Sequence, residues 1–127
     1  MVELGINTPI ITIPNFIRPD SFQPVYESGN YYIYAGRLSP EKGIRTLLSA
    51  VQRIKTDVEL VIAGSGELEQ DLRQFVQENN LTNVRFTGHL NTEELNALIQ
   101  RAICTVVPSE WYENYSMTII ESLASGT

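Results

Sequence analysis

Two cations stand close together in the segment GRLSPEKG, which covers residues 36–43. Arg37 offers a planar fork of hydrogen-bond donors and Lys42 offers a compact positive charge, and both groups suit a phosphate. A helical pattern begins directly after this segment, and the N-terminus of a helix favours anions. The two side chains could therefore converge on one phosphate above that helix. Ordinary solvated loop cations are the alternative, and the segment alone does not decide between the two.

Two glutamates form the second candidate group, in the segment PSEWYENYSMTIIES of residues 108–122. Glu113 lies in a predicted loop, and Glu121 lies in the predicted helix that follows, with seven residues between them. Apolar neighbours surround Glu121, and a poorly solvated carboxylate needs a ligand or an ion pair. Carboxylates accept paired hydroxyl donors such as those of ribose and hexose diols. Two surface glutamates with no ligand remain the other interpretation.

The segment GSGE of residues 64–67 resembles the start of a dinucleotide-binding fingerprint but departs from it. That fingerprint requires a third glycine three positions after the second, where this chain has Glu69. Glu67, Glu69 and Asp71 crowd the first turn of the next predicted helix and would repel a phosphate. We therefore expect a tight strand-to-helix turn, in which the glycines supply backbone freedom, and no NAD site.

His89 is the only histidine in the chain, in the segment TGHLNTEE of residues 87–94. No nucleophile or acid accompanies it in a catalytic arrangement, so a polar turn residue is the favoured interpretation. Asn91 and Glu94 have the spacing of a helix capping box. No second histidine and no pair of closely spaced aspartates is available for a divalent cation, so no metal site is predicted.

Composition narrows the class of protein. The chain has 127 residues, of which 43% are hydrophobic, enough for one compact domain. Its net charge is −6 and its basic residues are scattered, so we expect no nucleic-acid partner. The N-terminus lacks the positive charge of a secretory signal, and no apolar run is long enough to cross a bilayer. The single cysteine, Cys104, suits a reducing compartment, so a cytoplasmic location is predicted.

Strands and helices alternate in the predicted order of elements. Short β-branched or aromatic runs predict buried strands, and apolar residues at helical spacing predict a helix after each one. The predicted strands are Tyr31–Ala35, Val58–Ala63, Val84–Phe86 and Ile103–Val107, and the predicted helices are Ile44–Ile54, Leu68–Val76, Leu95–Ala102 and Ser116–Ala124. This alternation predicts an α/β, Rossmann-like fold with a parallel sheet and helices on both faces. The candidate residues above then lie in loops beyond the carboxyl ends of the strands, where such sheets bind ligands, except Glu121, which lies in the helix after the last of these loops.

The two ends of the chain differ from the middle. Residues 1–30 are rich in proline and are expected to be an interdomain linker, so the domain proper is predicted to cover residues 31–127. The last helix places Met117, Ile120, Leu123 and Ala124 on one face and closes on Gly126, the usual preparation for a further strand. We therefore expect a partial domain whose final strands are missing. Its sheet would expose an open edge, through which the fragment could self-associate.

Taken together, these segments resemble the retaining glycosyltransferases of family 4, which have the GT-B fold. The resemblance rests on GRLSPEKGI, VIAGSGE, VRFTGHL and the pair Glu113 and Glu121 followed by SLASGT, in this order and spacing. Residues 31–127 resemble the C-terminal, donor-binding domain of that family. Ile13–Asn15 resembles its crossover segment from the N-terminal domain.

The resemblance implies a role for each candidate residue. Arg37 and Lys42, beside Gly36, would hold the donor diphosphate in place of a metal, so no cofactor is expected. Glu113 would face the hydroxyls of the transferred sugar, and Glu121 would hold the ribose diol. The stretch near the base would be Gly88, His89 and Leu90, and the cradle of phosphate and sugar would be Asn114, Tyr115, Ser116 and Met117. Many family members have Pro-Phe-Gly directly after the first glutamate, so the altered loop leaves the sugar open.

The implied activity is transfer of a hexose-type sugar from a nucleoside diphosphate to an unknown acceptor in glycan biosynthesis. That acceptor would be bound by an N-terminal domain outside this chain, so the fragment alone is expected to be inactive. The resemblance also allows peripheral membrane association of the full-length enzyme. Two alternatives stay open: a GT-B sugar-nucleotide epimerase, and a non-catalytic nucleotide-binding or interaction module.

Overall fold

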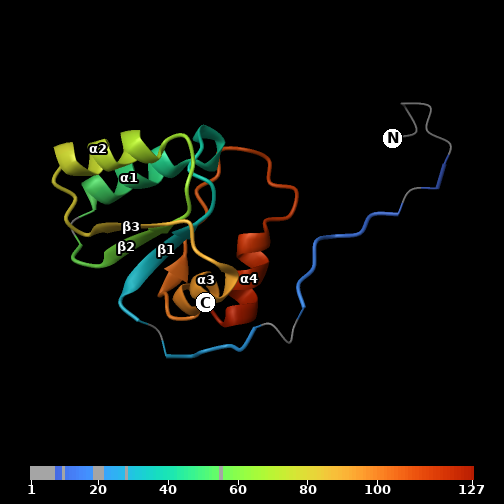
Figure 1. Cartoon of the computed structure of the whole chain (residues 1–127). Helices are drawn as coiled ribbons and strands as arrows, with labels where there is room; N and C mark the ends of the chain where they lie inside the picture. The colour runs from blue at the N-terminus through green and yellow to red at the C-terminus, as the bar shows by residue number, and fades with distance from the viewer. Residues whose placement is uncertain (1–7, 10, 19–21, 28, 55) are drawn as a thin grey trace.

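The computed structural model describes residues 8–9, 11–18, 22–27, 29–54 and 56–127. Its centre is a four-stranded parallel sheet in the order β3-β2-β1-β4 (Figure 1). The strands are β1 (Tyr31–Ala35), β2 (Glu59–Ala63), β3 (Val84–Gly88) and β4 (Cys104–Thr105). Every neighbouring pair is parallel, and each connection contains a helix. The predicted Rossmann-like α/β fold is confirmed.

Strand lengths differ from the prediction at three places. β2 begins one residue late, because the Val58 amide donates to the Thr56 hydroxyl outside the ladder. β3 continues to Gly88, with a register shift opposite Ile62 and Ala63 of β2. β4 has only two residues, although the Val106 amide still donates to the Ile33 carbonyl beyond its end. The apolar run around β4 thus supplies residues both to the strand and to the loop that follows it.

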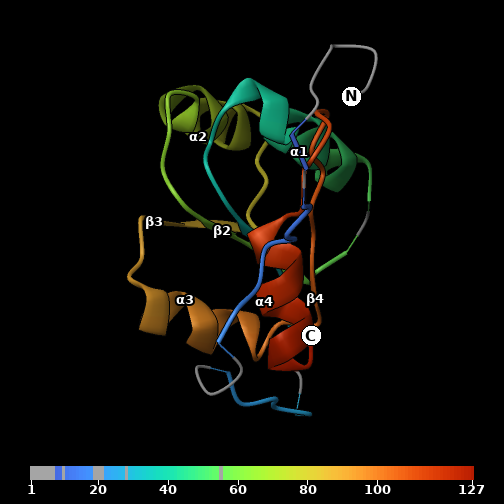
Figure 2. The same ribbon diagram turned by 90° about the vertical axis from the view of Figure 1, so that its right-hand side faces the viewer.

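Two layers of helices enclose the sheet. The helices are the short 3-10 helix η3 (Pro40–Lys42), α1 (Ile44–Arg53), α2 (Glu69–Glu78), α3 (Thr92–Ile99) and α4 (Met117–Ser125). α1 and α2 cover one face of the sheet, and α3 and α4 cover the other, as Figures 1 and 2 show. The predicted capping box is present at the start of α3, where Asn91 and Glu94 bond each other's backbone amides.

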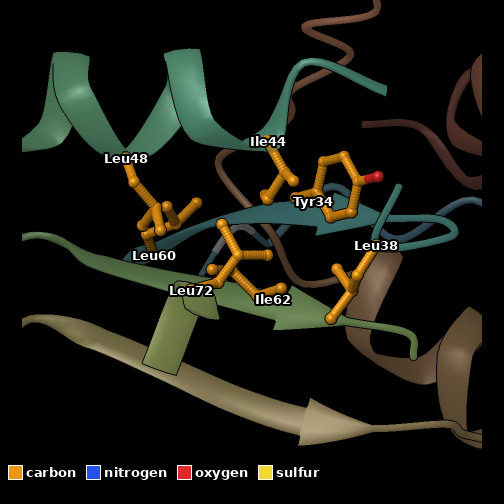
Figure 3. Packing of buried hydrophobic residues seen from close by; sticks show 7 residues of the cluster. All are labelled: Tyr34, Leu38, Ile44, Leu48, Leu60, Ile62 and Leu72. Atoms are coloured by element: carbon orange, nitrogen blue, oxygen red, sulfur yellow. The ribbon is translucent and has the colours of Figure 1, made fainter. Parts of the chain in front are cut away.

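The side chains of β1 and β2 alternate between the two faces and so build two apolar clusters. The cluster under α1 and α2 is shown in Figure 3 and contains Tyr34, Leu38, Ile44, Leu48, Leu60, Ile62 and Leu72. On the opposite face, Ile33, Val61 and Ala63 pack with Ile99 and Ala102. Burial of both faces explains why the strands read as continuous apolar runs.

The last helix buries a different side from the one that its pattern suggests. Leu123 is 72% exposed and Met117 is 39% exposed, whereas Ser122 and Ser125 are buried. The buried hydroxyls are satisfied, because Ser122 bonds Thr105 of β4 and Ser125 donates to the carbonyl of Glu121. Small serines therefore allow α4 to lie close to β4, and much of its apolar side faces outward.

The described residues of the predicted linker form neither helix nor strand. The amide of Val25 donates to the Ser125 carbonyl at the end of α4, and the Asn15 side chain donates to the Tyr115 carbonyl over 2.9 Å. Residues 1–7, 10, 19–21 and 28 of this segment lie outside the described part of the chain. The domain boundary after residue 30 stays a prediction.

Candidate functional site

The loops that follow the four strands meet at one edge of the sheet and border two cavities. The larger one has a volume of about 360 Å³ and is lined by Gly36, Arg37, Ala63, Gly64, Ser65, His89, Leu90 and Leu95. The smaller one has about 50 Å³ and is lined by Tyr34, Ala35, Gly36, Lys42, Val106, Val107, Ser109, Glu113, Ser116 and Thr118. Gly36 borders both cavities, so they lie side by side at the end of β1.

The loop after β1 is shaped by local backbone preferences. Pro40 starts the short helix η3, which ends at Gly43 in the left-handed conformation, with φ of 63°. A side chain at position 43 would be strained there and would also collide with the carbonyl of Pro108. This glycine therefore lets the loop after β4 approach the loop after β1.

Two further contacts fix the loop after β4 against η3 and α1. The amide of Glu110 donates to the carbonyl of Glu41 over 3.0 Å, and the Thr46 hydroxyl donates to the Glu110 carboxylate. These bonds join positions that are more than 60 residues apart in the sequence. The two candidate segments of the sequence are thus one structural unit.

Lys42 and Glu113 meet inside this unit. The Lys42 Nζ lies 2.5 Å from Glu113 Oε1, and the Ser109 hydroxyl donates to the same oxygen over 2.7 Å. The bond from Lys42, followed by that from Ser109, holds the pKa of the Glu113 carboxyl below its usual value. The side chains of Lys42 and Glu113 keep 33% and 27% of their accessible surface, so the ion pair is partly open to water. Glu113 is therefore ionised and oriented at neutral pH.

Glu121 has a different environment, in the second turn of α4. Burial raises the pKa of its carboxyl above the usual value, and desolvation is the cause of that shift. Within the described part of the chain, no hydrogen bond or ion pair satisfies this carboxylate. The expectation of a poorly solvated glutamate at this position agrees with the structure.

The sequence-predicted site residues fall into three groups. Arg37, His89 and Leu90 line the larger cavity, and Lys42, Glu113 and Ser116 line the smaller one, with Gly36 between them. The remaining candidates line neither cavity: Gly88, Asn114, Tyr115, Met117 and Glu121. Arg37 and Lys42 thus stand on neighbouring cavities, and Lys42 is engaged by Glu113 in this structure.

Sequence reasoning overlooked several lining residues. Gly64 and Ser65 form the expected tight turn, with φ of 138° at Gly64, and a side chain there would collide with the Gly36 carbonyl. The same turn is also a wall of the larger cavity. Its place at the carboxyl end of β2, the neighbour of β1, was a signal for this role. Ser109 was also overlooked, although it stands four residues before Glu113, within reach across a turn.

The described residues contain neither a metal-binding cluster nor a membrane-spanning helix. No group of three or more His, Cys, Asp or Glu side chains among them gathers as a metal ion would require. No helix in this part of the chain has the length and apolar character needed to cross a membrane.

The strand order and the loops at the carboxyl ends define a Rossmann-like α/β domain of the GT-B type. The family model described as "Glycosyl transferases group 1" matches residues 17–127. The chain therefore belongs to the group 1 glycosyl transferases.

Relatives of known function point to the same family. The glycogen synthase of Mycobacterium tuberculosis is 38% identical over 100 residues, which cover 75% of this chain and 24% of that protein. The O-antigen chain mannosyltransferase C of Escherichia coli is 37% identical over 93 residues, which cover 72% of this chain and 24% of that protein. The chain thus spans about a quarter of the length of these relatives.

Solved structures share the fold. Sucrose-phosphate synthase from Thermosynechococcus elongatus is 29% identical and superimposes with a TM-score of 0.74 over 87% of this chain and 32% of that one. A mutant of S. aureus TarM, in complex with Fondaparinux, alpha-GlcNAc-glycerol and UDP, is 21% identical, with a TM-score of 0.81 over 98% of this chain and 26% of that one.

Proposed function

We propose that this chain is the donor-binding part of a retaining family 4 glycosyltransferase. It binds a nucleoside diphosphate sugar, and the full-length protein transfers the sugar to an acceptor held by another domain. The observation that carries this proposal is the joined pair of loops at the sheet edge. Those loops place a lysine, a carboxylate and the N-terminus of α4 around one small cavity.

The chemistry of these groups suits a departing diphosphate. Ser116 and Thr118 of the α4 N-terminus line the cavity that contains Lys42, and Ser116 makes no side-chain cap that would occupy the first amides. Those amides favour an anion, and a lysine charge adds to them. Arg37 stands on the neighbouring cavity, where the nucleotide would lie. Positive groups of this kind stabilise the charge that develops on the leaving oxygen, without a metal ion.

The larger cavity supplies the nucleotide end of the proposed site. His89 and Leu90 form a wall suited to a nucleotide base. At Gly64 and Ser65, the small residues allow the nucleotide to approach the backbone of the chain closely. Glu121 would accept the two ribose hydroxyls, which would offset the cost of its burial. Because UDP is present in the TarM complex, it is the first nucleotide to test.

The test is calorimetric titration of the full-length protein with UDP, GDP and ADP, with EDTA present. We expect Arg37→Ala and Lys42→Ala each to weaken the binding of the best nucleotide roughly tenfold to a hundredfold, because each removes a hydrogen bond to a charged group. Arg45→Ala is the matched control, since Arg45 pairs with Asp71 away from both cavities. Unchanged affinity in both site variants would refute the proposal.

A second measurement addresses the reaction class. Incubation of the full-length protein with a UDP sugar, with and without a saccharide acceptor, separates transfer from epimerisation. Retention requires the product to keep the anomeric configuration of the donor. Loss of donor without any acceptor, with an epimerised sugar as product, would replace the transferase proposal by an epimerase.

A further inference from the structure

An ion pair forms part of the wall of the smaller cavity. Lys42 and Glu113 lie on its wall, and their contact is the 2.5 Å bond between Nζ and Oε1. The remaining volume is about 50 Å³. A cavity needs about 10–15 Å³ of such volume to hold one water molecule, so this space holds a few waters and is smaller than a diphosphate. A diphosphate that binds Lys42 at this wall therefore competes with the Glu113 carboxylate for the ammonium group.

Glu113 has a second bond that does not depend on Lys42. The Ser109 hydroxyl donates to Oε1 over 2.7 Å. Ser109 is itself held in place, because the next residue, Glu110, is bonded through its amide and through its carboxylate to η3 and α1. When Lys42 leaves, Ser109 still anchors the carboxylate.

We propose that Lys42 exchanges partners when the donor binds, passing from Glu113 to the diphosphate, while Ser109 keeps Glu113 oriented toward the transferred sugar. Ser109 is thus a positioning residue, which acts through Glu113. This inference rests on the proposed function, since it assumes that the incoming anion is the donor diphosphate. The exchange is feasible because a partly exposed ion pair is weak and a diphosphate carries more charge than a carboxylate.

The exchange makes one unusual prediction about affinity. Glu113→Gln removes the competitor of the diphosphate, so UDP should bind the full-length variant more tightly, by about two- to fivefold, the range set by a partly exposed pair. Glu110→Gln is the matched control, because it removes the same charge from the same loop and keeps an oxygen for Thr46. Tighter binding in Glu113→Gln with wild-type affinity in Glu110→Gln supports the exchange. Weaker or unchanged binding in Glu113→Gln, or equal tightening in both variants, overturns it.

The role of Ser109 is tested by kinetics of sugar transfer. Ser109→Ala should lower kcat about tenfold or more, since a bond to a charged group is lost, and leave the KM for the donor unchanged. Ser109→Thr keeps a hydroxyl and should restore most of kcat. A wild-type kcat in Ser109→Ala, or a loss that Thr does not restore, overturns the positioning role.

Lys42 separates a failure of this inference from a failure of the proposed function. If Lys42→Ala weakens UDP binding and Glu113→Gln does not tighten it, only the exchange is wrong. If Lys42→Ala leaves UDP binding unchanged, the diphosphate role itself is wrong. The double variant with Lys42→Ala and Glu113→Gln should bind UDP no more tightly than Lys42→Ala alone, because the lysine that Glu113→Gln would release is absent.

Discussion

Two regions of the domain are stabilised in opposite ways. Apolar packing stabilises the face of the sheet under α1 and α2, whereas polar bonds hold the loops at the carboxyl edge. Under the helices, Leu48, Ile62 and Leu72 have no exposed surface and belong to one apolar cluster. At the edge, Lys42 and Glu113 keep about a third of their surface and are held by polar bonds. Apolar burial makes a rigid base, and the bonds above it can be exchanged for bonds to a ligand. Stability and binding should therefore respond to different substitutions.

The largest effect is expected in the apolar face. Leu72→Ala removes a fully buried side chain from α2 and leaves a cavity, so the free energy of unfolding should fall by about 2–5 kcal/mol. Urea denaturation measures this loss, with the exposed Gln70→Ala on the same helix as control. Nucleotide affinity of the folded protein should not change. A loss of about 0.5 kcal/mol or less, the size of an ordinary surface substitution, would remove the contrast between the two regions.

An intermediate effect is expected at Glu121, where stability and binding should move in opposite directions. Burial raises the pKa of this carboxyl, so ionisation destabilises the folded state as the pH rises through that pKa. Glu121→Gln removes the charge, and without ligand its melting temperature should exceed the wild-type value at pH 7. The difference should vanish below about pH 4, where the carboxyl is protonated in both states.

The same variant should bind nucleotide less well. Loss of a charged acceptor for the ribose hydroxyls should weaken UDP about tenfold and raise the KM of the donor, with kcat largely preserved. Glu78→Gln, on the exposed side of α2, serves as the charge-matched control. A lower melting temperature with normal UDP affinity would show that Glu121 has a structural role instead.

The smallest effect is expected on the surface between the two helices of the apolar face. Arg45 and Asp71 form an ion pair over 3.2 Å, with more than half of each side chain exposed. A double-mutant cycle with Arg45→Ala and Asp71→Ala should give a coupling of about 0.2–1 kcal/mol, which disappears at high salt. A larger, salt-resistant coupling would mean that polar bonds also stabilise the rigid base.

Local patterns predicted most of the fold. The run YYIYA gives β1 with its predicted bounds, and the capping box at Asn91 fixes the start of α3. These features depend on neighbours within a few residues, so the sequence displays them directly. The last helix was the exception, because its serines bond to Thr105 and to its own carbonyls, and such partners are invisible in a pattern of apolar residues.

The candidate site was predicted less completely. The residue types and their loops were found, because the carboxyl edge of a parallel sheet collects them. The ion pair between Lys42 and Glu113 was not, since it spans 71 positions and depends on the close approach of two loops at Gly43. Whether any of the candidate residues contacts a donor stays a prediction.

Gly36 has a consequence for inhibitor design. It is the shared wall of a cavity of about 360 Å³ and one of about 50 Å³, and it has no side chain to separate them. A Cβ at this position would come within 3.1 Å of the Tyr34 hydroxyl, so there is little room for a bulkier residue here. A fragment anchored in the larger cavity could be extended across this glycine toward Lys42. Replacement of Gly36 by a larger residue, which would confer resistance to such an inhibitor, would then crowd the end of β1 on which the site is built.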